Sequence, residues 1–560
     1  MRRWLRWAAV TTCPLAAVLS AQRPPPPTQP AAGSSSSELT LRLTTHLVQV
    51  NVIVNDNRGN PISGLSQEDF SILDNGKPQE IRVFSAETNV PSASPQIPLP
   101  PDTYTNRPEE QTNIPASVTV ILLDALNTEA RDRPFARSQV IQALQNIRPQ
   151  EYVALYWLGD SLQILHDFTS DSSVLKQVLA AFKSESKPGG EKTEVPDTRL
   201  NSPNPSIPGG QSYERNAFRH ITEQRIANLV TRDRVLTTVS ALIAIANHLG
   251  TRKGRKNLVW VSSAFPATLD YNDHDLDMTS RVGVDLTTDT KRAARALTNA
   301  DIAVYPADAR GLVGTTIRAD GDTTRSVPET FDTMRLLAEH TGGKPFYGTN
   351  DISGAVRQAI NDSRVTYKLG YYPTAVNWDG RFHELKVKVA VSGAKVRARS
   401  GYFALPDAPI VPVKNDHGLI AQLATSGLPA TGIGLHVHAQ TSMASGVSDL
   451  TAEVHIDLHE IQTQQNEGHR TAAFQSVFLQ LDNRGRILKA DDRTFYPDFD
   501  ARTYERALQT GISDTRQVRV VPNAAQLCIV VRDAATANMG SIYLPLARYT
   551  SRPNADPSYH

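Results

Sequence analysis

The segment that most constrains the fold of this chain is an apolar run that ends in a carboxylate, Ser-Val-Thr-Val-Ile-Leu-Leu-Asp at 117–124. A strand buried on both faces has this continuous Val, Ile and Leu pattern, and such strands occur in parallel sheets that helices cover. Ligands of these sheets bind beyond the carboxyl ends of the strands. Asp124 lies at that end of its strand, so we predict a binding site around it.

The region around this run alternates between strand-like and helix-like segments from 116 to 373. Strands alternating with helices favour an α/β fold with a doubly wound parallel sheet. A stretch rich in Ser, Pro, Gly and charged residues at 184–212 interrupts the pattern, and we interpret it as a disordered surface insertion. We predict strands at 117–124, 152–158, 162–168, 257–262, 302–306 and 367–372, and helices at 137–147, 173–182, 213–249, 290–300, 330–340 and 352–362.

An N-terminal module at 39–86 has β character. It alternates with period 2 at 48–55 and contains a hairpin signal, Asp-Asn-Gly at 74–76. The module is short for an independent sandwich. We therefore expect the strands at 382–403, within the segment 374–405, to complete it.

The C-terminal residues 414–552 contain mostly strand-like segments, and we predict an immunoglobulin-like or fibronectin-like β-sandwich. Two of its strands carry polar residues at i, i+2 spacing, a spacing that can place metal ligands side by side. Apolar residues alternate with the second group, so we interpret its polar face as the solvated one. The two groups are His436 and His438, and His455, Asp457 and His459.

The N-terminus has a basic start, a short apolar stretch and small residues before Gln22, which predicts a signal peptide at 1–21. An uncleaved anchor is the alternative. Linkers rich in Pro and polar residues follow at 22–38 and 87–115. Cleavage leaves Cys528 as the one cysteine, in an apolar strand typical of a core position. We expect an exported protein (periplasmic, in the cell envelope or extracellular) with no membrane span in the mature chain.

Several short segments follow one another in the order known from one protein family. They include Ile-Leu-Leu-Asp-Ala-Leu-Asn-Thr at 121–128, and the others are at 48–56, 64–70, 254–263, 304–312, 338–343, 367–373 and 399–403. In this series the chain resembles the von Willebrand factor A (vWA) domain, and more specifically the bacterial VWFA-related domain family named for acidobacterial proteins. The resemblance covers residues 46–405 and implies the vWA fold. The functions of the family are largely unassigned.

The resemblance also implies a metal-ion-dependent adhesion site, built from an Asp-x-Ser-x-Ser loop, a Thr and a later Asp. Such oxygen ligands suit Mg²⁺ or Mn²⁺ with one position open for a partner's carboxylate. Asp124 and Thr128 match the loop, whereas Leu126 replaces its first serine and Ser263 replaces the later Asp. The candidate ligands are therefore Asp124, Thr128 and Ser263 of a degenerate site. In the alternative, Asp124 caps backbone amides of the following loop.

Other polar residues extend the predicted binding face at the same edge. Asn127 and Ser262 lie beside the candidate ligands in sequence. Asp273, Asp275 and Asp277 follow in a loop that could bring carboxylates over the edge. This loop lacks the Gly and the closing Glu of a calcium-binding loop, so its ordinary interpretation is a solvated turn.

These features predict a binding module that engages another protein, with its metal site retained in degenerate form. The alternative is a structural or assembly factor of the cell envelope whose metal site is vestigial. A net charge of +1 does not favour nucleic acid, and the basic run at 252–256 fits a helix C-terminus. The chain has no hydrolase elbow, zinc-protease or phosphate-loop motif, so we do not expect an enzyme.

Overall fold

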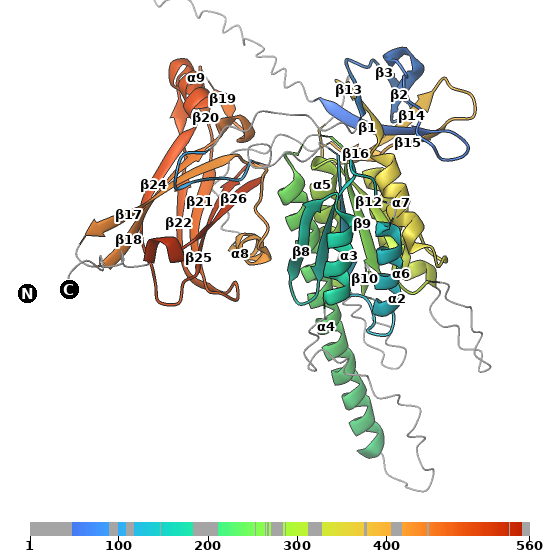
Figure 1. The fold of residues 1–560 in the computed structure, drawn as a ribbon, viewed down its shortest axis with the longest axis horizontal. Coiled ribbons are helices and arrows are strands. Elements are labelled where there is room, and N and C mark those ends of the chain that lie inside the picture. The colour runs from blue at the N-terminus through green and yellow to red at the C-terminus, as the bar shows by residue number, and fades with distance from the viewer. Residues whose placement is uncertain are drawn as a thin grey trace, which may run out of the picture. The chain divides into compact units, whose positions relative to one another are not determined.

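The computed structural model describes residues 47–550 apart from 89–98, 108–116, 183–210, 270–283, 312–326, 374–377, 405–416 and gaps of one or two residues. The predicted signal peptide at 1–21, the linker at 22–38 and most of the insertion at 184–212 lie outside the described residues. Within them, the chain is a mixed α/β protein with several sheets, one of which contains parallel strands (Figure 1).

The central sheet has five strands in the order β12-β9-β6-β7-β8. All neighbours are parallel except β8, which is an antiparallel edge strand. Every residue of β6, β9 and β12 is buried, as expected for strands covered on both faces. The strands are β6 (Val118–Asp124), β7 (Tyr152–Leu158), β8 (Leu162–Thr169), β9 (Lys256–Ser262) and β12 (Ile302–Asp308).

Helices cover both faces of this sheet. Val235 and Leu242 of α4, Leu297 of α5 and Met334 of α6 share one core with the sheet. Residues of the other three helices share a second core on the opposite face. The sheet is therefore doubly wound. The helices are α4 (Gln211–Leu249), α5 (Thr287–Asn299) and α6 (Val327–Thr341) on one face, and α2 (Arg133–Leu144), α3 (Ser172–Ala181) and α7 (Ile352–Asp362) on the other.

One predicted strand of the α/β region lies elsewhere. β13 (Val365–Tyr371) pairs antiparallel with β1 (Val48–Asn55) and β4 (Val83–Thr88), in a sheet that β15 (Lys395–Arg397) completes. Its placement in the parallel sheet was wrong. Most of its residues are buried on both faces, so its composition resembles that of a strand of the parallel sheet. Its antiparallel pairing with β1 and β4 is what assigns it to the other sheet.

A second small sheet packs on the first and shares its core. β14 (Phe382–Val389) pairs with β2 (Phe70–Asp74) and β16 (Gly401–Phe403), and β2 pairs with β3 (Lys77–Gln79). The strands at 382–403 thus pair with strands of the N-terminal module: β14 pairs with β2, and β15 pairs with β1. The hairpin turn between β2 and β3 has positive φ at Asn75 (45°) and Gly76 (78°), the conformation for which Asn-Gly is preferred.

The C-terminal part has two four-stranded sheets whose facing residues form one core. One sheet has the order β24-β18-β17-β5 and the other β22-β21-β25-β26. Helix α8 (His417–Ser426) packs on the outer face of the second sheet near the buried, free Cys528. The strands are β5 (Thr103–Thr105), β17 (Leu435–Ala444), β18 (Val447–Ile456), β21 (Phe474–Leu481), β22 (Ile487–Phe495), β24 (Ile512–Arg519), β25 (Gln526–Asp533) and β26 (Met539–Pro545).

Part of the predicted linker at 87–115 belongs to this C-terminal unit. β5 pairs with β17, and Arg107 donates to Glu460 at 2.7 Å and to Asp457 at 2.6 Å. Residues 103–107 supply an edge strand and two ion pairs, so they are part of the C-terminal unit and not of a linker. The remaining elements are η1 (Gln67–Asp69), β10 (Thr268–Leu269), β11 (Val284–Asp285), η3 (Leu458–Glu460), β19 (Gln464–Asn466), β20 (His469–Thr471), β23 (Asp498–Phe499), α9 (Ala501–Thr510) and α10 (Ala547–Thr550).

The basic run at 252–256 follows the C-terminus of α4. Lys256 Nζ donates to the backbone carbonyls of Arg252 at 2.6 Å and Gly250 at 3.5 Å. Carbonyls just beyond a helix end attract a cation. Burial nevertheless lowers the pKa of Lys256 from its ordinary value of 10.5 to about 8, against a weaker opposing effect of Asp301.

This shift predicts a pH-dependent stability. Below pH 8 the folded state must hold a buried ammonium, a cost that disappears as pH rises from about 8 to 10.5 because only the folded state then loses the proton. We expect the free energy of unfolding of the unmodified protein, minus that of Lys256→Met, to rise over this range by up to about 3 kcal/mol. Urea titrations at several pH values measure it. A difference independent of pH would contradict the assignment.

Among the residues that the structure describes, no helix combines the length and the apolar character needed to cross a membrane.

Candidate functional site

The candidate site is the carboxyl edge of the central sheet, where β6 ends at Asp124. The Asp124 side chain is buried and its two carboxylate oxygens accept four hydrogen bonds. Oδ1 accepts from the backbone N–H of Asn127 at 3.0 Å. Oδ2 accepts from Asn127 Nδ2 at 2.8 Å, Trp260 Nε1 at 3.0 Å and Ser262 Oγ at 2.9 Å. These four donor groups come from three residues, and the carboxylate is the acceptor that they share.

The strand pattern explains why Trp260 and Ser262 reach the same oxygen. Side chains two positions apart on a strand project from one face, and the pairing of β6 with β9 places Trp260 opposite Leu122. Trp260 was not among the predicted site residues. Its i, i+2 spacing from Ser262 on the strand beside β6 is the signal that could have identified it.

Helix α4 supplies a further part of the network that sequence reasoning missed. Asn127 Nδ2 also donates to Thr238 Oγ1 at 2.7 Å, and Arg234 Nη2 donates to Asn127 Oδ1 at 3.4 Å. Both partners lie over 100 residues along the chain from Asn127. No local pattern connects segments so far apart, so only the folded helix reveals the contact.

The loop after Asp124 is held from its other side by Arg133, the first residue of α2. Its Nη2 donates to the carbonyl of Ala125 at 2.7 Å, and its Nε donates to the carbonyl of Thr128 at 3.1 Å. Burial lowers the pKa of Arg133, while the Asp124 carboxylate opposes that effect and Arg234 adds to it. Burial likewise raises the pKa of Asp124, against the four hydrogen bonds that favour its charged form.

A second buried carboxylate at this edge also escaped the sequence analysis. Asp308 ends β12 directly opposite Ser262 in the register. Its two oxygens accept from the Nε and Nη2 of Arg310, both at 3.0 Å, and Oδ1 accepts from the backbone N–H of Arg310 at 2.9 Å. The resulting two-pronged ion pair neutralises Asp308 within its own loop.

The described residues do not fit a divalent cation in this arrangement. Three of the four donors around Asp124 meet Oδ2 and one meets Oδ1, so only one lone-pair position of this carboxylate, on Oδ1, remains open. Asp308 is committed to Arg310. Thr128 Oγ1 and Ser263 Oγ are buried without a hydrogen-bond partner, but two hydroxyls without a free carboxylate make a poor ligand set for Mg²⁺ or Mn²⁺. Within the described residues, no group of three His, Cys, Asp or Glu side chains is placed to hold a metal.

The predicted site residues therefore separate into three groups. The structure joins Asp124, Asn127 and Ser262 in one network. Thr128 and Ser263 follow Asn127 and Ser262 in the sequence. Both are buried, and neither side chain forms a hydrogen bond with Asp124. The contact between Asp124 and the N–H of Asn127 is the loop cap that was the alternative to metal binding. Asp273, Asp275 and Asp277 lie outside the described residues.

The histidine groups of the C-terminal unit do not form a shared site. His436 and His455 lie opposite each other on β17 and β18. The prediction that His455, Asp457 and His459 share one strand was wrong, because β18 ends at Ile456 and His459 lies in η3. Asp457 and the exposed His459 instead form their own local hydrogen bond at 2.8 Å.

Comparisons with known proteins add little. No family model matches the sequence, and no curated protein matches it. Solved structures similar to the chain include an aerotolerance-related membrane protein from Bacteroides fragilis, with 15% identity over 44% of this chain and 98% of that one, at a TM-score of 0.24. BatB from Bacteroides thetaiotaomicron has 14% identity over 44% and 98%, at 0.22. The ArnB paralog VWA2 from Sulfolobus acidocaldarius has 10% identity over 68% and 81%, at 0.21. At these TM-scores the similarities support no argument about this chain.

Proposed function

We propose that this chain is an exported, vWA-type binding module that engages another protein at the carboxyl edge of its central sheet, without a divalent ion and without catalysis. The observation that supports it best is the fixed loop after β6. Asp124 holds the loop through Asn127, and Arg133 holds it through two backbone carbonyls. A loop ordered before binding loses less conformational entropy on binding.

The fixed loop presents exposed groups to a partner. The side chain of Arg131 is 79% exposed and pairs with Glu129, which is 38% exposed. Surface ion pairs of this kind contribute little to stability, so they can be exchanged for contacts with a partner. The position of the loop agrees with the place where open α/β sheets bind their ligands.

Metal independence is the first testable part of the proposal. Titration of the mature chain with MgCl₂ or MnCl₂ in a calorimeter is expected to give no saturable heat. The reason is that Asp124 has only one lone-pair position open, on Oδ1, and the other described oxygen ligands beside it are the hydroxyls of Thr128 and Ser263. Asp124→Asn serves as the matched variant. Saturable binding that this variant loses would overturn the proposal and restore a working metal site.

The alternative function, a structural or assembly factor that makes its contacts through the β units, is favoured by a different observation. The C-terminal unit is joined to α4: Thr431 N–H donates to the Asn247 carbonyl at 2.8 Å, and His248 Nδ1 lies 2.7 Å from the Pro429 carbonyl. Burial lowers the pKa of His248, which keeps this contact in its neutral form. Contacts of this kind suit a chain that binds other proteins through its β units.

Site-specific photo-crosslinking in the producing cell separates the two functions. A crosslinking residue at Arg131 reports on the sheet edge, and one at the exposed Tyr496 reports on the C-terminal unit. We expect one discrete protein adduct from position 131, unchanged by a chelator and lost on Glu129→Arg. Adducts from position 496 alone would refute the binding edge and favour the structural role.

A further inference from the structure

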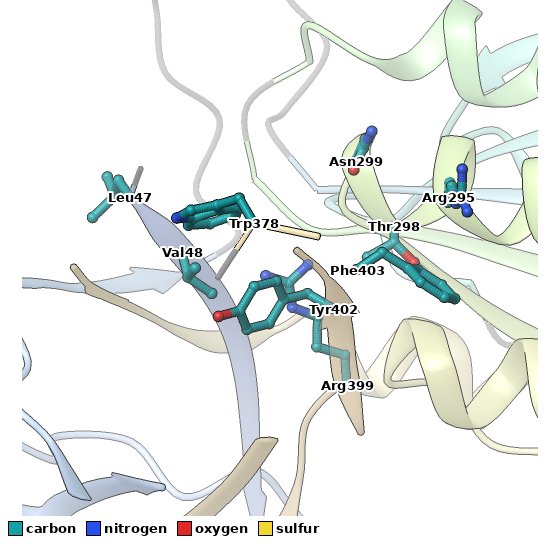
Figure 2. Close-up of a pocket in the computed structure, with 9 residues that line it drawn as sticks. All are labelled: Leu47, Val48, Arg295, Thr298, Asn299, Trp378, Arg399, Tyr402 and Phe403. Atoms are coloured by element: carbon teal, nitrogen blue, oxygen red, sulfur yellow. The ribbon is translucent and has the colours of Figure 1, made fainter. Parts of the chain in front are cut away.

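The two small sheets that share one core, β15-β1-β13-β4 and β16-β14-β2-β3, form the N-terminal unit. A cavity of about 190 Å³ lies between helix α5 and this unit, far in sequence from the Asp124 loop. Figure 2 shows Arg295, Thr298 and Asn299 of α5 on one side, Trp378 and Leu47 on the other, and Arg399 and Tyr402 between them. The segments that meet here come from separate parts of the chain, and the site exists only in the folded protein.

Two guanidinium groups line this cavity without a carboxylate partner in the described part of the chain. Arg399 Nη2 donates to the backbone carbonyl of Gln49 at 2.5 Å, whereas its Nε is buried with no partner. Arg295 Nε is also buried with no partner. Both residues are partly buried, and a cation partly withdrawn from water without an ion-pair partner favours an incoming anion. Burial lowers the pKa of Arg399 by more than the nearby Asp301 carboxylate raises it.

Aromatic rings form the remaining walls. The Trp378 and Tyr402 rings lie 6.1 Å apart at an angle of 44°, and the Arg295 guanidinium lies 5.0 Å above the Phe403 ring. The Tyr402 hydroxyl already donates to Asp74 at 2.8 Å, so this residue offers its ring rather than its hydroxyl. An aromatic ring of a ligand gains from such tilted neighbours.

We propose that this cavity, lined by Arg295, Arg399, Trp378 and Tyr402, binds a small monocyclic aromatic anion, a carboxylate or phosphate ester whose charged group meets the two arginines. The size agrees with one ring, since a cavity of roughly 150 Å³ is enough for benzene. A guanidinium fork matches the two oxygens of a carboxylate or phosphate. The site is independent of the proposed function at the sheet edge.

The test is calorimetric titration of the full chain with benzoate and with phenyl phosphate, beside benzamide as the neutral analogue and inorganic phosphate as the ringless one. We expect saturable binding of at least one aromatic anion, at least tenfold weaker in Arg295→Gln, and no comparable binding of benzamide or phosphate. Arg292→Gln is the matched control, because Arg292 lies on the same helix and pairs with Asp289 instead. Equal affinity in the two variants, or no binding of either aromatic anion, would overturn the proposal.

Fluorescence gives a second readout that does not depend on an arginine substitution. Binding is expected to change the tryptophan emission of the unmodified chain, because Trp378 lines the cavity. In Trp378→Phe the emission change should disappear while the calorimetric heat remains. An emission change of the same size in that variant would place the ligand elsewhere and would refute the assignment.

Discussion

Replacing Asp124 with leucine is expected to lower the free energy of unfolding by about 4 kcal/mol, since each buried donor left without its acceptor costs about 1–3 kcal/mol. The substitution leaves the Trp260 indole, the Ser262 hydroxyl and both amide donors of Asn127 buried without their shared acceptor. Urea denaturation monitored by tryptophan fluorescence measures the effect, because Trp260 lies inside the network.

Two comparison variants separate this network from a simple loop cap. Asp124→Asn keeps one carbonyl acceptor and should lose less stability than the leucine variant. Asp171 caps α3 by accepting from the backbone N–H groups of Ser173 and Val174, and Asp171→Ala should cost about 1 kcal/mol. A loss in Asp124→Leu no larger than that of Asp171→Ala would contradict the network. A loss that appears only in the presence of Mg²⁺ would instead indicate an ion.

The sequence predicted the α/β core well because its signals are local. Continuous apolar runs identified β6, β7 and β9 within a residue at each end, and helix α7 agrees with its predicted limits. Fully buried strands and amphipathic helices reveal their environment through their own composition. The position of Asp124 at the end of β6 followed from the same pattern, whereas the burial of its side chain is seen only in the fold.

The failures share a different physical cause, which is pairing between distant segments. The composition of β13 fits a strand of either sheet, so only its pairing with β1 and β4 assigns it to the N-terminal unit. β5 is three residues long inside a polar stretch, and its partner β17 begins about 330 residues later. At the site, Thr238 and Arg234 approach Asn127 because α4 packs across the edge.

The second large effect is expected at Asp362, the last residue of α7. Its fully buried carboxylate accepts from Tyr305 at 2.7 Å, from Gln358 at 2.9 Å and from Asn55 of β1 at 3.5 Å, and it pairs with Arg397 of β15. One acidic group thus connects the α/β region with two strands of one N-terminal sheet, β1 and β15. Asp362→Leu leaves the Arg397 guanidinium without its counter-charge, so we expect a loss of about 3–5 kcal/mol in the free energy of unfolding.

A double-mutant cycle with Arg397→Met shows whether this loss reflects the ion pair itself. In Asp362→Leu/Arg397→Met both charges are gone, so the double variant should be more stable than Asp362→Leu alone, with a coupling of at least about 1 kcal/mol. Asp351→Ala, which removes the exposed cap at the other end of α7, controls for damage to the helix and should cost only about 1 kcal/mol. If the two single losses simply add, Asp362 stabilises α7 through Tyr305 and Gln358 and not through its pairing with Arg397. The N-terminal unit would then be held to the α/β region mainly by its other contacts, including the bond from Ser400 N–H to the Glu339 carbonyl at 3.0 Å.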